Sequence, residues 1–386
     1  MPVVLILGAR APVALDHARR FARQGWKVCL ADSISCKGSV WSRSAHADIR
    51  IPSPRKDPRG FVREICVAAA AYRADLLLPT CEEVFYVSRY RDALPAGLTV
   101  VTDHFDKLTA LHSKLEFLKL ATGCGAKVPS SAAVSSLAAA REWAGSRPVV
   151  LKPEFSRFGV HVRLYPQGVP ADAPELDARL GRWIVQEFCA GEELCSYSVA
   201  LAGELTAHVV YRPLYRLSRS SSYYFDPARV VEIRDFVARF VRKTGYTGQI
   251  SFDWIQGQDG QFAVLECNPR AISGAHLFSA TDALPAAFTI VSDSPVEPAG
   301  QRAKMIAAVM LTAGLVSAVR ENRLSRWLSD CRRADDVITE PGDRLPLLGN
   351  VADLVSHALR AVRGGCSVRE AATRDIEWDG EGLPEC

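Results

Sequence analysis

Short apolar segments alternate with amphipathic helical patterns over residues 1–105. Between the first two segments, Leu15, Ala18 and Ala22 recur at helical spacing, and Gly25 supplies a stop. Strands that alternate with helices in this way form an open parallel sheet, so we predict an α/β, doubly wound domain. The strands are expected at residues 3–7, 27–31, 75–78 and 98–101.

The turn after the first strand departs from a dinucleotide-binding site. Asp32 does follow the second strand, where such sites place the acid that binds a ribose. However, only Gly8 is present of the three glycines in the fingerprint, so a pyrophosphate could not approach the backbone closely. An NAD-dependent oxidoreductase built on this segment is therefore disfavoured, although it stays as the alternative from another class.

A second region with α+β character starts near residue 106. Ser113 and Glu116 form a capping box that opens a helix. Residues 147–164 then predict a strand, a polar turn and a second strand, which is typical of a hairpin lid. We expect one domain at 1–105, another at 106–295 with a lid subdomain at about 113–185, and a C-terminal extension at 296–386 without an interpretable motif.

Further along, the pattern predicts a helix followed at once by two paired strands. Asp226-Pro227 predicts the N-cap and first-turn proline of the helix, and Gly245 predicts its end. The strands at 249–255 and 261–266 are separated by a glycine-containing turn, which predicts an antiparallel hairpin.

The composition of the chain excludes several kinds of binding partner and metal site. A net charge of +4 over 386 residues does not give the basic face that nucleic-acid binding requires. Eleven cysteines without a CxxC pair indicate reduced thiols rather than a disulfide framework or a zinc site. The longest uncharged apolar run, 305–319, is shorter than the roughly 18 residues of a membrane span, and the amino terminus is typical of a strand rather than a signal peptide. We expect a cytoplasmic protein with no membrane partner, and a homodimer by default.

Three oxygen-bearing side chains lie on the two strands of the predicted hairpin. Glu266 and Asn268 are two residues apart and point to the same side, while Asp253 lies on the neighbouring strand. Carboxylates in such apolar strands are costly to bury without compensation. Hard oxygen ligands suit Mg²⁺, which proteins usually bind with one or two carboxylates plus substrate phosphates. The pattern favours a metal site over ordinary surface acids, and it implies phosphate chemistry.

The spacing of these residues resembles the ATP-grasp superfamily, especially its carbamoyl-phosphate-synthase-like and biotin-carboxylase-like members. In that family an acid is followed thirteen residues later by the Glu of a Glu-x-Asn-x-Arg sequence, and here Asp253 precedes Glu266-Cys-Asn-Pro-Arg270 by that distance. The resemblance covers about residues 1–290 and implies a pre-ATP-grasp domain followed by an ATP-grasp domain. It implies ATP with Mg²⁺, or Mn²⁺ as a substitute, bound through Asp253, Glu266 and Asn268. Asn268 and Arg270 would also act in catalysis.

The resemblance further implies a nucleotide site. Two lysines match those that touch the phosphates, and compact ammonium charges suit that role. The segment 183–193 resembles the hinge that holds adenine and, after its glycine, the ribose. The turn at 153–159 has one glycine where relatives have several, so side chains there would replace backbone donors. The implied ATP-binding residues are Lys114, Lys152, Ser156, Arg157, Gln186, Glu187, Phe188, Cys189 and Glu193.

Other candidates carry a weaker signal. Arg212 and Arg216 lie in a basic segment that often completes the family's site, but a solvated basic loop would look the same. Glu82 and Glu83 follow the third strand at the carboxyl end of the sheet, where ligands bind and where relatives place an acid for the amine; a helix first turn also favours acids. Two residues complete the substrate candidates: Gly274, for close backbone approach, and His276, although a lone histidine is more often structural.

The resemblance implies an ATP-dependent carboxylate–amine ligase that forms an amide through an acyl phosphate and releases ADP and phosphate. Arg270 would hold the transferred phosphoryl group. Thioester formation, carboxylation and phosphorylation are alternatives within the same superfamily, and a nucleotide-binding module without turnover is a further one. The expected partners are a small-molecule carboxylate and an amine, whose identities the sequence does not indicate.

Overall fold

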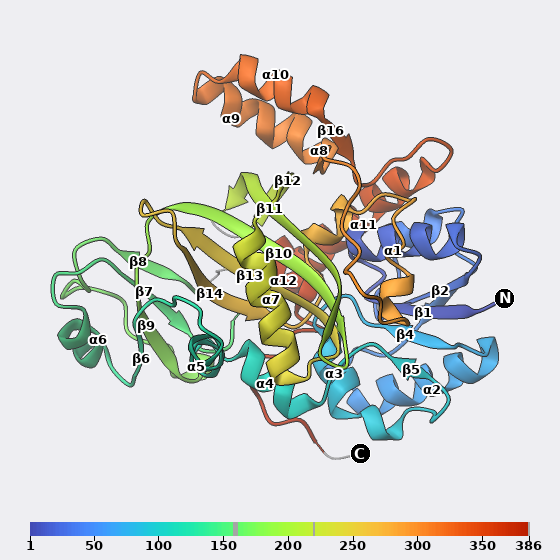
Figure 1. The fold of residues 1–386 in the computed structure, drawn as a ribbon, viewed down its shortest axis with the longest axis horizontal. Coiled ribbons are helices and arrows are strands. Elements are labelled where there is room, and N and C mark those ends of the chain that lie inside the picture. Colours follow the sequence, from blue (N-terminus) through green and yellow to red (C-terminus); the bar gives the residue numbers. More distant parts are fainter. Residues whose placement is uncertain (157–160, 219–220, 385–386) are drawn as a thin grey trace.

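The computed structural model describes residues 1–156, 161–218 and 221–384, which are arranged around three β-sheets (Figure 1). The first sheet has five strands in the order β3-β2-β1-β4-β5, the second has seven in the order β14-β13-β10-β11-β12-β15-β16, and the third has four in the order β6-β9-β7-β8. Within the described part of the chain, no helix combines the length and apolar character that a membrane crossing requires.

The first sheet is entirely parallel, which confirms the predicted doubly wound domain. Alternate residues of β1 face opposite sides, so Val3, Leu5 and Leu7 pack with helix α2 while Val4 and Ile6 pack with helix α1. The short edge strand β3 was not predicted, because its four residues alternate between half-buried and exposed. The strands and helices are β1 (Val3–Leu7), α1 (Pro12–Arg23), β2 (Lys27–Asp32), η1 (Gly38–Trp41), β3 (Ala47–Arg50), α2 (Pro58–Tyr72), β4 (Leu76–Leu78), α3 (Glu83–Arg89), η2 (Arg91–Ala93), β5 (Thr99–Val100) and α4 (Phe105–His112).

The third sheet lies in the segment for which a lid is predicted, and we call it the lid sheet after that prediction. Strands β7 and β8 pair in the antiparallel sense, as the hairpin pattern at 147–164 predicts. The predicted capping box is wrong: Ser113 Oγ accepts from the backbone N–H of Glu116 at 3.1 Å, but the Ser113 N–H donates to the carbonyl oxygen of Thr109 at the end of α4, and Leu115 is the N-cap of α5. The elements are α5 (Glu116–Gly123), β6 (Ser131–Val134), α6 (Leu137–Ala144), β7 (Val149–Pro153), β8 (Arg163–Tyr165), η3 (Ala178–Leu180) and β9 (Trp183–Glu187).

The seven-stranded sheet contains the predicted antiparallel hairpin as β13 and β14. Helix α7 packs on it through Phe236 and Phe240, which contact Phe252 of β13. The predicted cap at Asp226-Pro227 is wrong, because both residues belong to β12 and pair with β11, so the ladder outweighs the local capping signal. The elements are β10 (Glu192–Leu201), β11 (Glu204–Ser218), β12 (Ser221–Ala228), α7 (Val231–Thr244), β13 (Gly248–Gln256), β14 (Phe262–Asn268), η4 (Ser273–Leu277) and η5 (Ala286–Phe288).

Residues after 296 extend the seven-stranded sheet and then pack against the first domain. Strand β15 extends the seven-stranded sheet beside β12, and β16 extends it further. The chain then returns to the first domain, where Arg19 Nε of α1 donates to Asp343 Oδ2 at 2.8 Å. The elements are β15 (Ala303–Met305), α8 (Ala307–Val309), η6 (Met310–Gly314), α9 (Leu315–Arg320), α10 (Leu324–Arg333), β16 (Ala334–Asp336), α11 (Leu345–Gly364) and α12 (Val368–Thr373).

The tail after α12 lies across the carboxyl ends of the parallel strands. Arg10, which follows β1, donates from Nη1 to Asp375 Oδ1 at 2.6 Å and also binds Asp32 at the end of β2. Tyr86 Oη of α3 donates to the carbonyl oxygen of Glu377 at 2.8 Å. Asp32 therefore forms an ion pair with Arg10. This agrees with the sequence of the turn after β1, which departs from that of a dinucleotide-binding site.

Trp378 anchors this tail in an aromatic cluster. The indole is buried, and its ring centroid lies 4.9 Å from that of Phe85 and 5.3 Å from those of Phe105 and Phe155. The cluster joins the tail to the first domain and to Phe155, which follows β7 of the lid sheet. The tail is thus packed into the molecule rather than loosely attached.

We expect Trp378→Ala to lower the free energy of unfolding by about 3–5 kcal/mol, because it leaves a cavity among three other rings. Trp378→Phe is the matched control, since it keeps one aromatic ring in the cluster and should lose much less. Urea unfolding of both variants measures the difference. Equal unfolding midpoints for the two variants would show that the indole does not anchor the tail.

Candidate functional site

A cavity of about 740 Å³ lies between the lid sheet and the seven-stranded sheet. Its lining comes from β7 and β9 on one side and from β10, β11, β13 and β14 on the other, so elements more than a hundred residues apart meet there. Many residues predicted from the sequence gather in this one place. They are Lys114, Lys152, Ser156, Gln186, Glu187, Phe188, Cys189, Glu193, Arg216, Asp253, Glu266, Asn268 and Arg270.

Two carboxylates face each other across the hairpin. Asp253 of β13 and Glu266 of β14 are directly opposed in the antiparallel register, next to an irregularity in the pairing. Burial and the neighbouring charge of Glu266 raise the pKa of Asp253. Burial alone would also raise the pKa of Glu266, but the ammonium groups of Lys114 and Lys152 outweigh it and lower that pKa. The two buried carboxylates therefore repel each other when both are charged, and a cation bound between them would offset that repulsion.

The donor set fits a divalent metal that shares its coordination with a ligand. Asn268 lies two residues after Glu266 on β14 and lines the same cavity, which gives three oxygen donors. Among the described residues, no group of three or more His, Cys, Asp or Glu side chains forms a complete metal cage. Two carboxylates and an amide oxygen, with phosphates completing the shell, are the usual provision for Mg²⁺.

Two buried lysines supply positive charge to the cavity. Lys114 Nζ donates to the carbonyl oxygens of Glu154 at 3.1 Å and Ser156 at 3.0 Å, and Lys152 Nζ donates to Gln186 Oε1 at 2.9 Å. Burial lowers the pKa of Lys114 to about 8, although Glu266 opposes the shift, and burial also lowers the pKa of Lys152. An anionic ligand would restore the preference of both groups for the charged form.

Arg270 links the cavity to the first domain. Its Nη2 donates to Asn268 Oδ1 at 3.3 Å and its Nη1 to the carbonyl oxygen of Ala271 at 3.1 Å. Its Nε lies 3.4 Å from Oε1 of the buried Glu82, which follows β4. Glu82 thus lies behind Arg270 rather than in the cavity lining, and it orients the guanidinium.

The other cavity residues lie where the lid sheet meets the end of β10. Gln186 ends β9 with Glu187, and its side chain bridges Lys152 and Ser131 Oγ, the latter at 3.0 Å. Phe188 is partly exposed at the same edge. Glu193 forms an ion pair with Arg216, so this carboxylate and guanidinium lie together at the cavity.

Five predicted residues lie outside the cavity lining. Glu82 is described above, and Glu83 accepts from the backbone N–H groups of Thr80 and Cys81 at 2.9 Å, which matches the helix-terminus alternative. Arg212 Nε pairs with Glu192 Oε1 at 2.7 Å.

Gly274 and His276 are the last two of these five. An added Cβ at Gly274 would come within 2.5 Å of Tyr197 Cβ, so this glycine allows close packing. His276 is buried and bonded to Asp16 of α1, which matches the structural alternative for a lone histidine. Arg157 lies outside the described residues.

Sequence reasoning missed several residues of the cavity lining, and two of them lie on strands beside the carboxylates. Cys195 of β10 is opposite Asp253 in the register, and its thiol donates to Asp253 Oδ1 at 3.3 Å. Tyr211 of β11 is opposite Cys195. Neither residue lies in a local motif, so only the strand register could have placed them beside the carboxylates.

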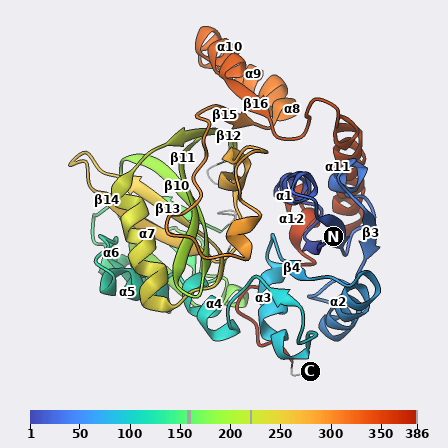
Figure 2. The same ribbon diagram turned by 45° about the vertical axis from the view of Figure 1, so that its right-hand side comes forward.

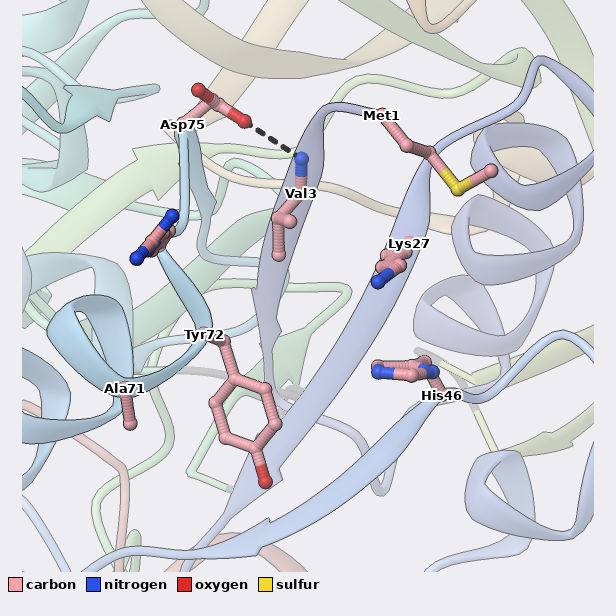
Figure 3. A pocket seen from close by; sticks show the side chains of 8 residues that line it. Met1, Val3, Lys27, His46, Ala71, Tyr72 and Asp75 are labelled. Atoms are coloured by element: carbon pink, nitrogen blue, oxygen red, sulfur yellow. Dashed lines mark hydrogen bonds between the residues drawn. The ribbon is translucent and has the colours of Figure 1, made fainter.

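A second hollow of about 460 Å³ lies at the amino ends of β1, β2 and β4 (Figure 3). Asp75 Oδ2 there accepts from the backbone N–H of Val3 at 2.8 Å. Ligands of open α/β sheets bind at the carboxyl ends of the strands, which is the opposite edge. Because it lies at the amino ends, this hollow is not the candidate site. The remaining residues of its lining are Met1, Lys27, His46, Ala71, Tyr72 and Arg73.

Comparison with solved structures shows that the chain shares its fold with several enzymes at 12–15% identity, in agreement with the fold that the sequence resemblance implies. The ADP complex of N5-carboxyaminoimidazole synthetase from Staphylococcus aureus matches with a TM-score of 0.61 at 14% identity, over 82% of this chain and 86% of that one. Biotin carboxylase from Campylobacter jejuni matches with a TM-score of 0.62 at 14% identity, over 78% and 75%. L-amino acid ligase from Bacillus licheniformis matches with 0.54 at 15% identity, over 71% and 68%. No family model and no curated protein sequence matches the chain.

Proposed function

We propose that the protein is an ATP-dependent carboxylate–amine ligase, which forms an amide through an acyl phosphate and releases ADP and phosphate. The observation that carries this proposal is the opposed pair Asp253 and Glu266, which shares one cavity with Lys114, Lys152 and Arg270. Two structures of the same fold support a nucleotide substrate, because one was solved with ADP and another with MgADP and bicarbonate. The proposed partners are a small-molecule carboxylate and an amine.

Different residues of the cavity would bind different parts of ATP. Asp253, Glu266 and Asn268 would hold Mg²⁺, or Mn²⁺ in its place, which would supply positive charge to the phosphate oxygens. Lys114 and Lys152 would neutralise the remaining phosphate charge as compact cations. The edge from Gln186 to Cys189 would hold the adenine, and Glu193 would accept from the ribose hydroxyls.

The reaction proposed for this site has two steps. A carboxylate oxygen attacks the terminal phosphorus of ATP, the bond from that phosphorus to ADP breaks, and an acyl phosphate forms. The amine then attacks the acyl carbon, loses a proton, and displaces phosphate. Arg270, oriented by Glu82 and Asn268, would stabilise the charge on the transferred phosphoryl group. Positioning and electrostatics carry both steps, so no covalent enzyme intermediate is needed.

The products distinguish acyl phosphate formation from adenylation, the other common way to activate a carboxylate with ATP. We expect ADP and phosphate, because the three oxygen donors and Arg270 lie within one short stretch, while the proposed nucleoside-binding edge lies across the cavity on the lid sheet. A panel of carboxylates is incubated with ATP, Mg²⁺ and hydroxylamine, which traps an acyl phosphate as a hydroxamate. Hydroxamate and ADP should appear in equal amounts with the correct carboxylate. AMP and pyrophosphate in their place would refute the mechanism.

A further inference from the structure

Helix α11 turns its apolar side outward. The residues that face the rest of the molecule are small or polar and are buried, namely Gly349, Asp353, His357 and Ala361. The opposite side carries a stripe of aliphatic side chains that are between 53% and 82% exposed, namely Leu348, Val351, Val355, Leu359 and Val362. A helix that packs only against its own domain shows the reverse arrangement. Figures 1 and 2 show α11 on the outside of the first domain, on the far side of the molecule from the lid helix α6.

The polar side of α11 holds this orientation. Gly349 lies against the indole of Trp41 in η1, where an added Cβ would come within 2.7 Å of Trp41 Cδ1. His357 Nε2 lies 3.1 Å from Asp353 Oδ1, and its Nδ1 lies 2.7 Å from Arg360 Nη2. Rotating the helix to bury the stripe would expel Gly349 from this contact and place a side chain of the stripe against the indole. The stripe therefore stays on the surface of a single chain.

The exposed area is large for a monomer. With the flanking Leu345, Leu347 and Leu354, the stripe presents apolar surface on the order of 600–800 Å², whereas monomeric proteins rarely expose contiguous patches above a few hundred Å². A specific interface of standard size buries about 800 Å² on each partner. The area on α11 is thus close to what one half of a stable dimer interface requires.

The order of residues in the stripe identifies the partner. Val355 lies at its centre, Val351 and Leu359 lie four residues to either side, and Leu348 and Val362 lie seven residues to either side. A two-fold axis through Val355 would pair two antiparallel α11 helices, so that each of the five residues of the stripe meets another residue of the stripe. Such a pairing places Arg360 opposite Asn350 and Arg363 opposite Leu347, so no like charges face each other. We propose that two copies of this chain form a dimer through this stripe, with the axis at Val355.

The first test is the mass in solution. We expect the wild type to have twice the 42.1 kDa chain mass by light scattering, and the double variant Val351→Glu/Leu359→Glu to have the single-chain mass. Under the two-fold pairing, each new carboxylate would face another one across the interface. Val67→Glu on α2 is the matched control, because Val67 is 55% exposed, like Val351, and it should stay dimeric. Circular dichroism checks that the double variant is folded, which its exposed positions favour.

The second test fixes the axis. Helices packed about 8–10 Å apart bring residues on the axis close enough for a disulfide, so Val355→Cys should crosslink two chains under mild oxidation. Val67→Cys controls for the natural cysteines and should form no such product. A wild type with the single-chain mass at all concentrations would overturn the dimer, and so would a dimer that survives the double variant. Failure of Val355→Cys to crosslink within a dimer would overturn the proposed axis.

Discussion

Replacing Glu266 by Gln is expected to lower kcat by on the order of 10²–10³-fold while the protein stays folded. Glu266 shares the cavity with Lys114 and Lys152, which hold its pKa below the ordinary range and keep it charged. The amide has the same shape but lacks the charge that would hold the metal. It also removes the repulsion with Asp253, so the hairpin loses little stability. The rate of ADP release at saturating ATP measures the loss.

Glu204→Gln makes the same chemical change at an exposed position of β11, where the carboxylate pairs with Arg242 outside the cavity, and it should keep wild-type turnover. A Mg²⁺ titration of both variants separates metal binding from other effects. Full turnover of Glu266→Gln with an unchanged Mg²⁺ dependence would refute the assignment of this carboxylate to the metal. Loss of circular dichroism signal in this variant would assign the carboxylate to the fold instead.

The parts of the fold that the sequence predicts are those with strong local patterns. The buried strands of the first sheet are continuous apolar runs, so β1, β2 and β4 could be found to within about a residue. Strands β15 and β16 have three residues each and depend on β12 for their place, which no local pattern reveals. Asp226-Pro227 shows the same limit, because a good capping signal there gives way to pairing with β11.

The candidate site divides in the same way. Asp253, Glu266, Asn268 and Arg270 lie on one hairpin, so their spacing along the chain already fixes their neighbourhood. The contact between Arg270 and Glu82 joins residues nearly two hundred positions apart, and it follows from how two domains pack.

Other contacts around the site could not be predicted for similar reasons. Trp378 packs against Phe155 from the far end of the chain.

The orientation of helix α11, away from the site, could not be predicted from the sequence either. An apolar stripe at helical spacing normally predicts the buried face of a helix, and here that face is exposed.

Arg270→Lys is expected to lower kcat by about 10²–10³-fold, with a change of less than about threefold in the KM for ATP. The guanidinium is fixed on three sides by Glu82, Asn268 and the carbonyl oxygen of Ala271, and it also lines the cavity. Lysine keeps the charge that compensates the buried Glu82, so the variant should fold. Its ammonium cannot reproduce the planar fork that grips a phosphoryl group while holding these partners. The loss should therefore appear in the chemical step rather than in nucleotide binding.

Arg212→Lys is the matched control for this prediction, because Arg212 pairs with Glu192 outside the cavity lining and should tolerate the change. Single-turnover formation of hydroxamate reports the chemical step, and displacement of a fluorescent ATP analogue reports binding separately. Glu82→Gln should weaken the chemical step in the same direction but less, since Asn268 and Ala271 still hold the guanidinium. If Arg270→Lys instead weakened ATP binding and left the single-turnover rate at the wild-type value, Arg270 would be a nucleotide anchor and not the group that stabilises phosphoryl transfer. Glu82 would then position Arg270 for nucleotide binding rather than for phosphoryl transfer.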